Sequence, residues 1–272
     1  MPNAPHDTTP EKEPLGLGGS TGSAPAQPAP PEAGGRFKPD PRFTAMNGYS
    51  RRAADKSGYT TPAGRLPGAT TILSATSAGK HRLEQWLKRP DSAAVSLAAR
   101  ERGTWTHTQI ESWLQGLPTE KHFAYGGYWR NIRPWLETHL VSALAIEGST
   151  WHPSGYAGTF DAVAHLSYAS SDAPYTAAQA EDMVTLVDWK TSARPRTADL
   201  LLDYFDQLGA YSASILHTYG VQVDRGVLVI ARPSGSTPDV YELTPDALAT
   251  HRARFFQRLN DYHAPRPLVP DM

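Results

Sequence analysis

A charged pair inside an apolar, strand-like run constrains this chain more than any other feature. Residues 185–191 read Thr-Leu-Val-Asp-Trp-Lys-Thr, so Asp188 and Lys190 lie two positions apart. On a β-strand, side chains two apart project from the same face. Charges in such a run are expensive to bury unless they serve a metal ion or a substrate; the alternative is a structural ion pair. The run therefore predicts a strand that presents an acid and an amine together.

The order of the predicted elements indicates a mixed α/β fold. Three segments with helical spacing of apolar residues come first, at 80–90, 92–116 and 127–145. Five strand-like segments follow, at 146–152, 159–168, 185–191, 226–231 and 240–243. Two further helices are expected at 197–219 and from Pro245 to about Tyr262. This order predicts a mixed sheet flanked by helices.

Details of the pattern refine this topology. The helix at 197–219 connects the third and fourth strands as a crossover, which allows those strands to be parallel. Residues 226–231 read Gly-Val-Leu-Val-Ile-Ala, which is too apolar for an edge strand and indicates a central one. Gly103 is a candidate kink within the second helix. The polar residues 169–182 predict a mobile extension between the second and third strands.

Composition divides the chain into a tail and one folded domain. Ten of the 24 prolines lie in the first 41 residues, a stretch with few large apolar side chains. Such a segment buries too little surface to offset the entropy of ordering, so residues 1–42 are expected to be disordered. Residues 43–272 are then expected to form a single domain, with a helical part at about 80–145 and a catalytic core at about 146–262.

Charge and cysteine content exclude several classes of protein. There are no cysteines, which excludes disulfides, thiolate zinc sites and iron–sulfur clusters. The net charge of −1 is unlike that of a protein that coats DNA, so contact with nucleic acid would depend on local basic clusters. No apolar stretch approaches the ~20 residues of a membrane span, and the tail resembles neither a secretory signal nor a transit peptide.

Three other groups of residues are candidates for the same site, each with a simpler structural explanation. Asp161 follows Gly-Thr-Phe just before a strand, where an acid is often only a turn residue. His107 and Glu111 are four apart on one helix face and could ligate a metal or only each other. Gln207 and Tyr211 share a helix face; the tyrosine fits core packing, whereas the glutamine needs a polar partner.

Taken together, these residues favour metal-assisted hydrolysis of a phosphodiester. Carboxylates hold a hard divalent cation through oxygen, and Lys190 would stabilise charge on the attacking water or on the phosphoryl oxygens. Arg194 and Arg196 directly follow the strand that carries the acid and the lysine, so they are candidates for binding a nucleic-acid strand. The chain is interpreted as a nuclease on this basis.

The ordered segments resemble the PD-(D/E)XK nuclease superfamily. The resemblance is to its RecB-like exonuclease branch, and most closely to phage and mitochondrial genome maintenance exonucleases. It extends from about Leu66 to Tyr262. Its most specific supports are Ala-Gly-Thr-Phe-Asp at 157–161, Val-Asp-Trp-Lys-Thr-Ser at 187–192 and Tyr-Phe-Asp-Gln-Leu-Gly-Ala-Tyr at 204–211. The resemblance implies a restriction-endonuclease-like mixed β-sheet flanked by helices, with an N-terminal helical arch.

The resemblance also implies roles for the candidate residues. Asp161, Asp188 and Lys190 would be catalytic, with Lys190 assisting the attacking water. Mg²⁺ or Mn²⁺ would be held by a set of nitrogen and oxygen ligands, namely His107, Asp161, Asp188, the Trp189 backbone carbonyl and Glu111, the last directly or through a water. Substrate would be bound by Gln207 and Tyr211, which match the branch's Gln-x-x-x-Tyr motif, together with Arg194 and Arg196.

The expected function is a metal-dependent DNA exonuclease that acts on single strands or frayed ends. If the helices at 80–145 form an arch over the site, only a strand with a free end can thread through it. The alternatives are an endonuclease of the same fold, a DNA-end-binding module that has lost catalysis, and a metal phosphohydrolase of small nucleotides. We expect a monomer with no membrane association, in the cytoplasm of a bacterial or phage-infected cell, with an organelle left open.

Overall fold

The computed structural model describes residues 35–43 and 58–264. The predicted disordered tail lies outside the described residues as far as position 34. Its described end, residues 35–42, pairs with the fold: the backbone N–H of Lys38 donates to the Ala143 carbonyl at 2.8 Å and that of Asp40 to the Leu144 carbonyl at 3.0 Å. This described segment therefore covers the β3 edge of the sheet.

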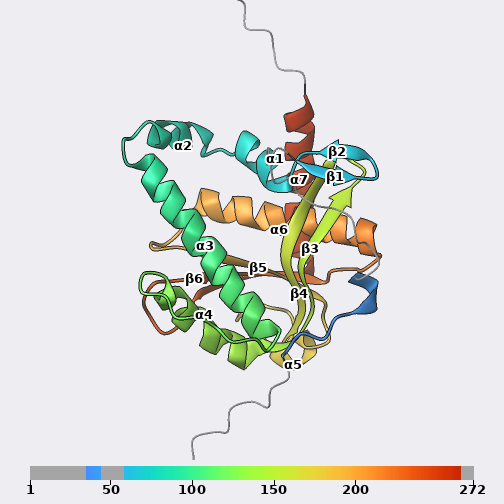
Figure 1. The fold of residues 1–272 in the computed structure, drawn as a ribbon. Coiled ribbons are helices and arrows are strands. Elements are labelled where there is room, and N and C mark those ends of the chain that lie inside the picture. The colour runs from blue at the N-terminus through green and yellow to red at the C-terminus, as the bar shows by residue number, and fades with distance from the viewer. Residues whose placement is uncertain (1–34, 44–57, 265–272) are drawn as a thin grey trace, which may run out of the picture. The chain divides into compact units, whose positions relative to one another are not determined.

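A five-stranded mixed sheet forms the centre of the described fold (Figure 1). Its order is β3-β4-β5-β6-β7, and the strands are β3 (Leu140–His152), β4 (Tyr156–Leu166), β5 (Thr185–Thr191), β6 (Arg225–Ala231) and β7 (Asp239–Leu243). Strands β5 and β6 are parallel, and all other neighbours are antiparallel. The predicted mixed sheet, its parallel pair and the internal position of residues 226–231 are confirmed. A separate ribbon pairs β1 (Tyr59–Thr61) with β2 (Gly64–Leu66).

Helices cover both faces of the sheet (Figure 1). One core lies against α3 (Ser92–Leu114) and α4 (Gly126–His139). The other lies against α1 (Ala69–Thr76), α6 (Ala198–Tyr219) and α7 (Pro245–His263). The shorter helices are α2 (Lys80–Leu87) and α5 (Ala177–Ala180). Within the described residues, no helix is long and apolar enough to span a membrane.

The structure differs from the sequence-based expectation at three places. The helix expected at 127–145 ends at His139, and its last part is strand, because residues 140–152 pair along the whole length of β4. Residues 169–182, expected to be mobile, are held: the Tyr175 hydroxyl donates to Glu242 at 2.7 Å, and Thr176 caps α5. The second expected helix is continuous through Gly103.

The close packing of α6 on α7 leads to a first prediction. A Cβ added at Gly209 would overlap the backbone of Arg252, whereas one added at Gly103 would meet no atom within 4 Å. Gly209→Ala should therefore lower the free energy of unfolding by about 1–3 kcal/mol. Gly103→Ala, also in a helix, should raise it by roughly 0.5–1 kcal/mol. Urea denaturation of both variants checks this; equal effects would contradict the close packing.

Candidate active site

The site lies where β4 and β5 separate. The β4–β5 ladder ends at the pair Ala162–Val187, so the next two residues, Asp161 and Asp188, are not paired with each other. In place of a ladder bond, the backbone N–H of Trp189 donates to Asp161 Oδ2 at 2.7 Å. The Asp161 carboxylate therefore ties the two strands together at the point where they diverge.

An irregularity in the β3–β4 hairpin brings a second acid to this point. Ile146 and Gly148 pair with Ala162 and Phe160, so Glu147 lies opposite Asp161. Glu147 has φ 49°, a conformation that few residues other than glycine adopt. Such strain persists only where surrounding structure imposes it, and it is often found at functional sites.

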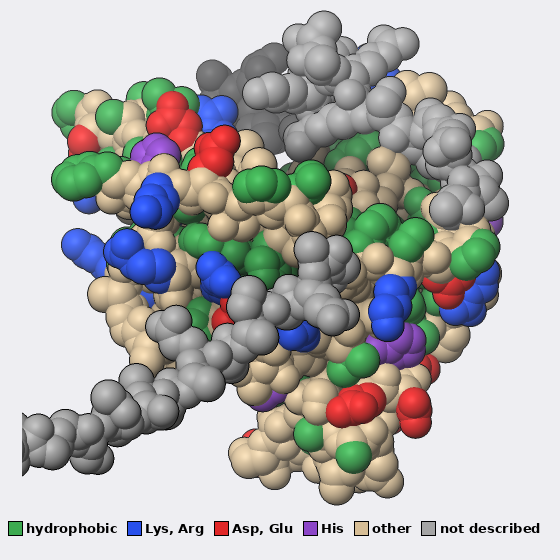
Figure 2. All heavy atoms as spheres, turned by 60° about the horizontal axis from the view of Figure 1, so that its bottom comes forward, with side chains coloured by type: hydrophobic (Ala, Val, Ile, Leu, Met, Phe, Trp, Pro, Cys, Tyr) green, Lys and Arg blue, Asp and Glu red, His purple; other side chains and the backbone are tan. Residues whose placement is uncertain are grey.

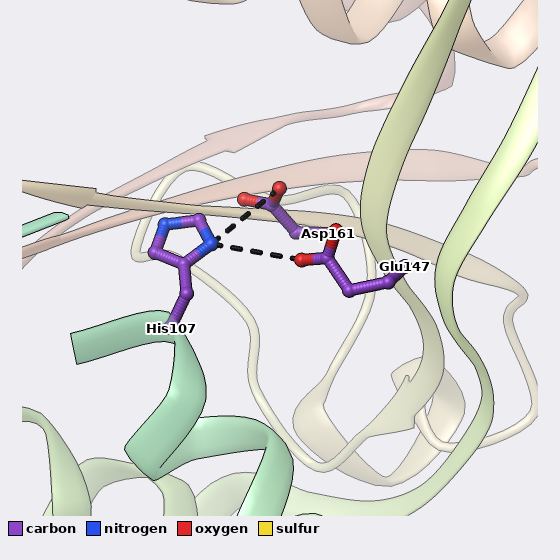
Figure 3. Close-up of side chains that lie close together, drawn as sticks. All are labelled: His107, Glu147 and Asp161. Atoms are coloured by element: carbon purple, nitrogen blue, oxygen red, sulfur yellow. Dashed lines mark ion pairs between the residues drawn. The ribbon is translucent and has the colours of Figure 1, made fainter. Parts of the chain in front are cut away.

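His107 reaches the two acids from α3 (Figure 3). Its Nδ1 lies 3.7 Å from Glu147 Oε1 and 3.8 Å from Asp161 Oδ1. Its Nε2 lies 2.9 Å from the Trp189 carbonyl oxygen. One ligand atom from each of His107, Glu147 and Asp161 lies within 4.8 Å of the other two. A helix and two strands thus bring together three side chains with nitrogen and oxygen donor atoms. We call His107, Glu147 and Asp161 the donor cluster.

The donor cluster attracts positive charge. Burial lowers the pKa of His107, but the nearby Asp161 and Glu147 carboxylates outweigh this and raise it to about 9. Glu111 lines the same hollow as His107 and Glu147, which has a volume of about 440 Å³. Burial and the charges of Glu147 and Asp161 raise the pKa of Glu111. Two acids that line the hollow, Glu111 and Glu147, and the nearby Asp161 form a site whose potential favours a cation.

Asp188 and Lys190 form a pair beside the donor cluster. The Lys190 ammonium contacts Asp188 Oδ2, and Gln207 Nε2 on α6 donates to Asp188 Oδ1 at 2.9 Å. Burial is the main reason that the pKa of Asp188 rises to about 6, while Lys190 lowers it and Asp161 raises it further. The strand thus presents its acid and lysine on one face, and the predicted need of Gln207 for a polar partner is met by Asp188.

The three other candidates for substrate binding, Tyr211, Arg194 and Arg196, differ in how far they are exposed. Tyr211 is buried and packs closely on Gly158, where an added Cβ would overlap its ring. Arg194 is exposed. Arg196 Nη2 donates to the Thr191 carbonyl at 3.2 Å, which holds this arginine next to the end of β5.

The structure therefore brings together most, but not all, of the ligand set that the resemblance implies. His107 and Asp161 meet in the donor cluster, and the Trp189 carbonyl lies against the other ring nitrogen of His107, Nε2. Asp188 lies close by, with Lys190 and Gln207 as partners. Sequence reasoning missed Glu147. One signal was present: Glu147 is the only acid in residues 140–152, and a glycine follows it. A methyl group at that glycine, Gly148, would overlap the ring of Phe160.

Comparison with known proteins identifies distant relatives. The chain is 26% identical over 217 residues to mitochondrial genome maintenance exonuclease 1 of Xenopus tropicalis. It is 25% identical over 215 residues to the Mus musculus protein of that name and 23% identical over 216 residues to the Homo sapiens protein. These exonucleases are distant homologues of the chain. The three alignments cover 73%, 72% and 72% of this chain, but only 58%, 59% and 58% of those proteins.

Two other comparisons add little. No family model matches the chain. A solved structure named "Crystal structure of SSO0001" aligns over 72% of this chain and 75% of its own, with 16% identity and a TM-score of 0.37.

Proposed function

We propose that the chain is a divalent-metal-dependent deoxyribonuclease of the PD-(D/E)XK type, which hydrolyses DNA from single-stranded or frayed ends. The observation that carries this proposal is the donor cluster of His107, Glu147 and Asp161 next to the pair of Asp188 and Lys190. The distant homologues are named genome maintenance exonucleases, which supports both the nuclease chemistry and the preference for ends.

The residues present fit Mg²⁺ or Mn²⁺. Two carboxylates, a backbone carbonyl and one imidazole form a set rich in oxygen, which suits these cations better than the softer metals that thiolates bind. His107, Glu147, Asp161 and the Trp189 carbonyl would hold the ion, and we keep Asp188 and Glu111 as further ligands. A cation bound there would polarise the phosphate and lower the pKa of its water.

The residues of the chain have separate tasks in this proposal. Lys190 places a positive charge where negative charge develops on the attacking water and the phosphoryl oxygens. Its contact with Asp188, and the hydrogen bond from Gln207, hold the acid and the amine in one orientation. Asp161 binds the Trp189 backbone and so fixes the donor cluster relative to that pair. Arg194 and Arg196 would contact the backbone of the substrate strand.

The surface is compatible with local rather than general binding of DNA. The net charge is −1, and Figure 2 shows Lys and Arg side chains scattered among hydrophobic ones, not a continuous basic surface. A protein of this kind gains little affinity from phosphates far from its site. We therefore propose a monomer that engages a short stretch of strand near its end, in the cytoplasm of a bacterial or phage-infected cell or in an organelle.

End-labelled oligonucleotides test the proposal. Linear single-stranded DNA should be degraded in Mg²⁺ or Mn²⁺, and EDTA should stop the reaction. Circular single strands should survive; their cleavage would instead indicate an endonuclease of the same fold. Binding without cleavage in either metal would indicate a DNA-end-binding module, and hydrolysis confined to mononucleotides would indicate a small-molecule phosphohydrolase.

Glu147 gives a second prediction because it is the acid that sequence reasoning did not find. Glu147→Gln keeps the size of the side chain but removes its charge from the donor cluster. The Mg²⁺ concentration that gives half of the maximal cleavage rate should rise by about ten- to a hundredfold. Glu137→Gln is the matched control, since that acid lies on the surface, paired with Arg133. Identical metal titrations of the two variants would exclude Glu147 as a ligand.

A further inference from the structure

A partly apolar hollow lies between α1, α2 and α6, and the proposed mechanism leaves it without a role. It has a volume of about 260 Å³. Its apolar walls include Leu83 from α2 and Leu200 and Tyr204 from α6, and Lys80 and Gln207 also line it. The two leucines are 48% and 40% exposed, so the apolar walls of the hollow are open to solvent.

The hollow is connected to the proposed catalytic pair through two of its lining residues. Gln207 lines the hollow and also donates its hydrogen bond to Asp188. The Tyr204 ring centroid lies 5.5 Å from Lys190 Nζ. A base held against Tyr204 would therefore lie close to Lys190. It could belong to the nucleotide whose phosphate contacts this lysine, or to the adjacent nucleotide of the strand.

The charges around the hollow suit a nucleotide. Asp203 is the only acid that lines the hollow. Arg258 Nη1 lies 2.7 Å from its Oδ1, and the Ser77 hydroxyl donates to its Oδ2 at 2.8 Å. Its charge is thus largely neutralised. Lys80 at the rim remains as a cation for a backbone phosphate. An apolar chamber with an aromatic wall and a cationic rim matches the planar base and anionic backbone of a nucleic acid.

We propose that this hollow, here called the base pocket, takes one unpaired nucleobase of the strand being cut, next to the scissile phosphate. The inference rests on the proposed nuclease function and deepens it. The walls of the hollow come from α1, α2 and α6, so in this proposal a base would have to leave its complementary strand to enter. The base pocket would therefore make the site selective for single-stranded or frayed ends.

Two leucine substitutions with matched controls test this. Leu83→Ala and Leu200→Ala remove apolar walls of the base pocket. Their controls are Leu87→Ala and Leu216→Ala, on the same two helices, where the leucines are 52% and 42% exposed and do not line the pocket. The substrates are a single-stranded oligonucleotide and versions with one abasic residue at each successive position from the end.

Affinity is measured by fluorescence anisotropy in EDTA, and cleavage separately in Mg²⁺. In the wild type, an abasic residue at one particular position should weaken binding about tenfold, the typical value of a single stacked base. Leu83→Ala and Leu200→Ala should weaken binding of the intact strand to a similar degree and show no further loss with that abasic strand. The two control variants should behave as the wild type does.

The outcomes separate the two proposals. If pocket and control variants bind alike, or if no abasic position matters, the base pocket is wrong even when the chain digests DNA. If binding depends on the pocket but no metal supports cleavage, the nuclease proposal fails while the pocket stands. Circular dichroism of each variant shows whether a loss of affinity reflects the pocket or misfolding.

Discussion

Asp161→Asn is expected to lower the rate of metal-dependent DNA cleavage by about a thousandfold. The substitution keeps an oxygen that can accept the hydrogen bond of the Trp189 backbone, so the end of the β4–β5 ladder should be preserved. It removes the negative charge that faces His107 Nδ1 at 3.8 Å and leaves Glu147 as the only carboxylate of the donor cluster. The variant thus separates the charge of Asp161 from its role in holding two strands together.

Initial rates on end-labelled single strands in Mg²⁺ and Mn²⁺ measure this effect. Asp261→Asn is the matched control, because this exposed acid on α7 contacts only Gln257 among the interactions described for it. Binding to the same strand in EDTA should be nearly unchanged in both variants. A cleavage rate for Asp161→Asn within a few-fold of the control would exclude the donor cluster as the metal site, whatever the fold.

Much of the fold could be predicted from the sequence because its signals are local. The strand at 185–191 and the helix at 197–219 were placed almost to the residue, since each has strong periodicity and clear ends. The crossover helix between the third and fourth strands allows their parallel pairing, which the structure shows. By contrast, the end of α4 was misplaced by six residues, because residues 140–145 become strand only through their partners in β4.

In the site, too, the residues that lie in local sequence patterns could be predicted, whereas one that depends on tertiary structure could not. Asp188, Lys190 and Gln207 lie in recognisable local patterns, and the structure brings all three together. The position of Glu147 depends on an irregularity in the β3–β4 hairpin. Phe160 and Ala162 are two residues apart on β4, yet they pack into opposite cores. No periodicity in the sequence predicts such a break. The register of the hairpin, which only tertiary packing determines, places this acid in the donor cluster.

Arg225→Met is expected to lower the free energy of unfolding by about 3–5 kcal/mol. Arg225 and Glu242 have fully buried side chains and form an ion pair at 2.5 Å. Arg225 also donates to Thr185 Oγ1 at 2.8 Å and to the Leu166 carbonyl at 2.9 Å, so it joins β4, β5, β6 and β7. Methionine fills a similar volume but leaves the buried Glu242 carboxylate without its cationic partner and the Leu166 carbonyl without the donor that Arg225 supplies.

Thermal and urea unfolding measure the loss, which corresponds to a fall in Tm on the order of 10 °C for a domain of this size. Arg133→Met is the control, because the pair of Arg133 and Glu137 is exposed and such pairs contribute about 0–1 kcal/mol. A loss for Arg225→Met no larger than that of the control would show that the buried pair is not a significant source of stability.

The pH dependence of this loss tests its electrostatic origin. Burial raises the pKa of Glu242, but hydrogen bonds from Ser170, Tyr175 and Arg225 outweigh it and hold this pKa below its ordinary value. In the wild type, the resulting stability is present above the unfolded pKa of about 4.3 and is lost as the pH falls through the lowered folded pKa. Without Arg225, burial should instead raise the pKa of Glu242, so that the carboxyl group becomes neutral in mild acid. The difference between variant and wild type should therefore be larger at pH 8 than at pH 5, whereas a purely steric cause would make it equal at both.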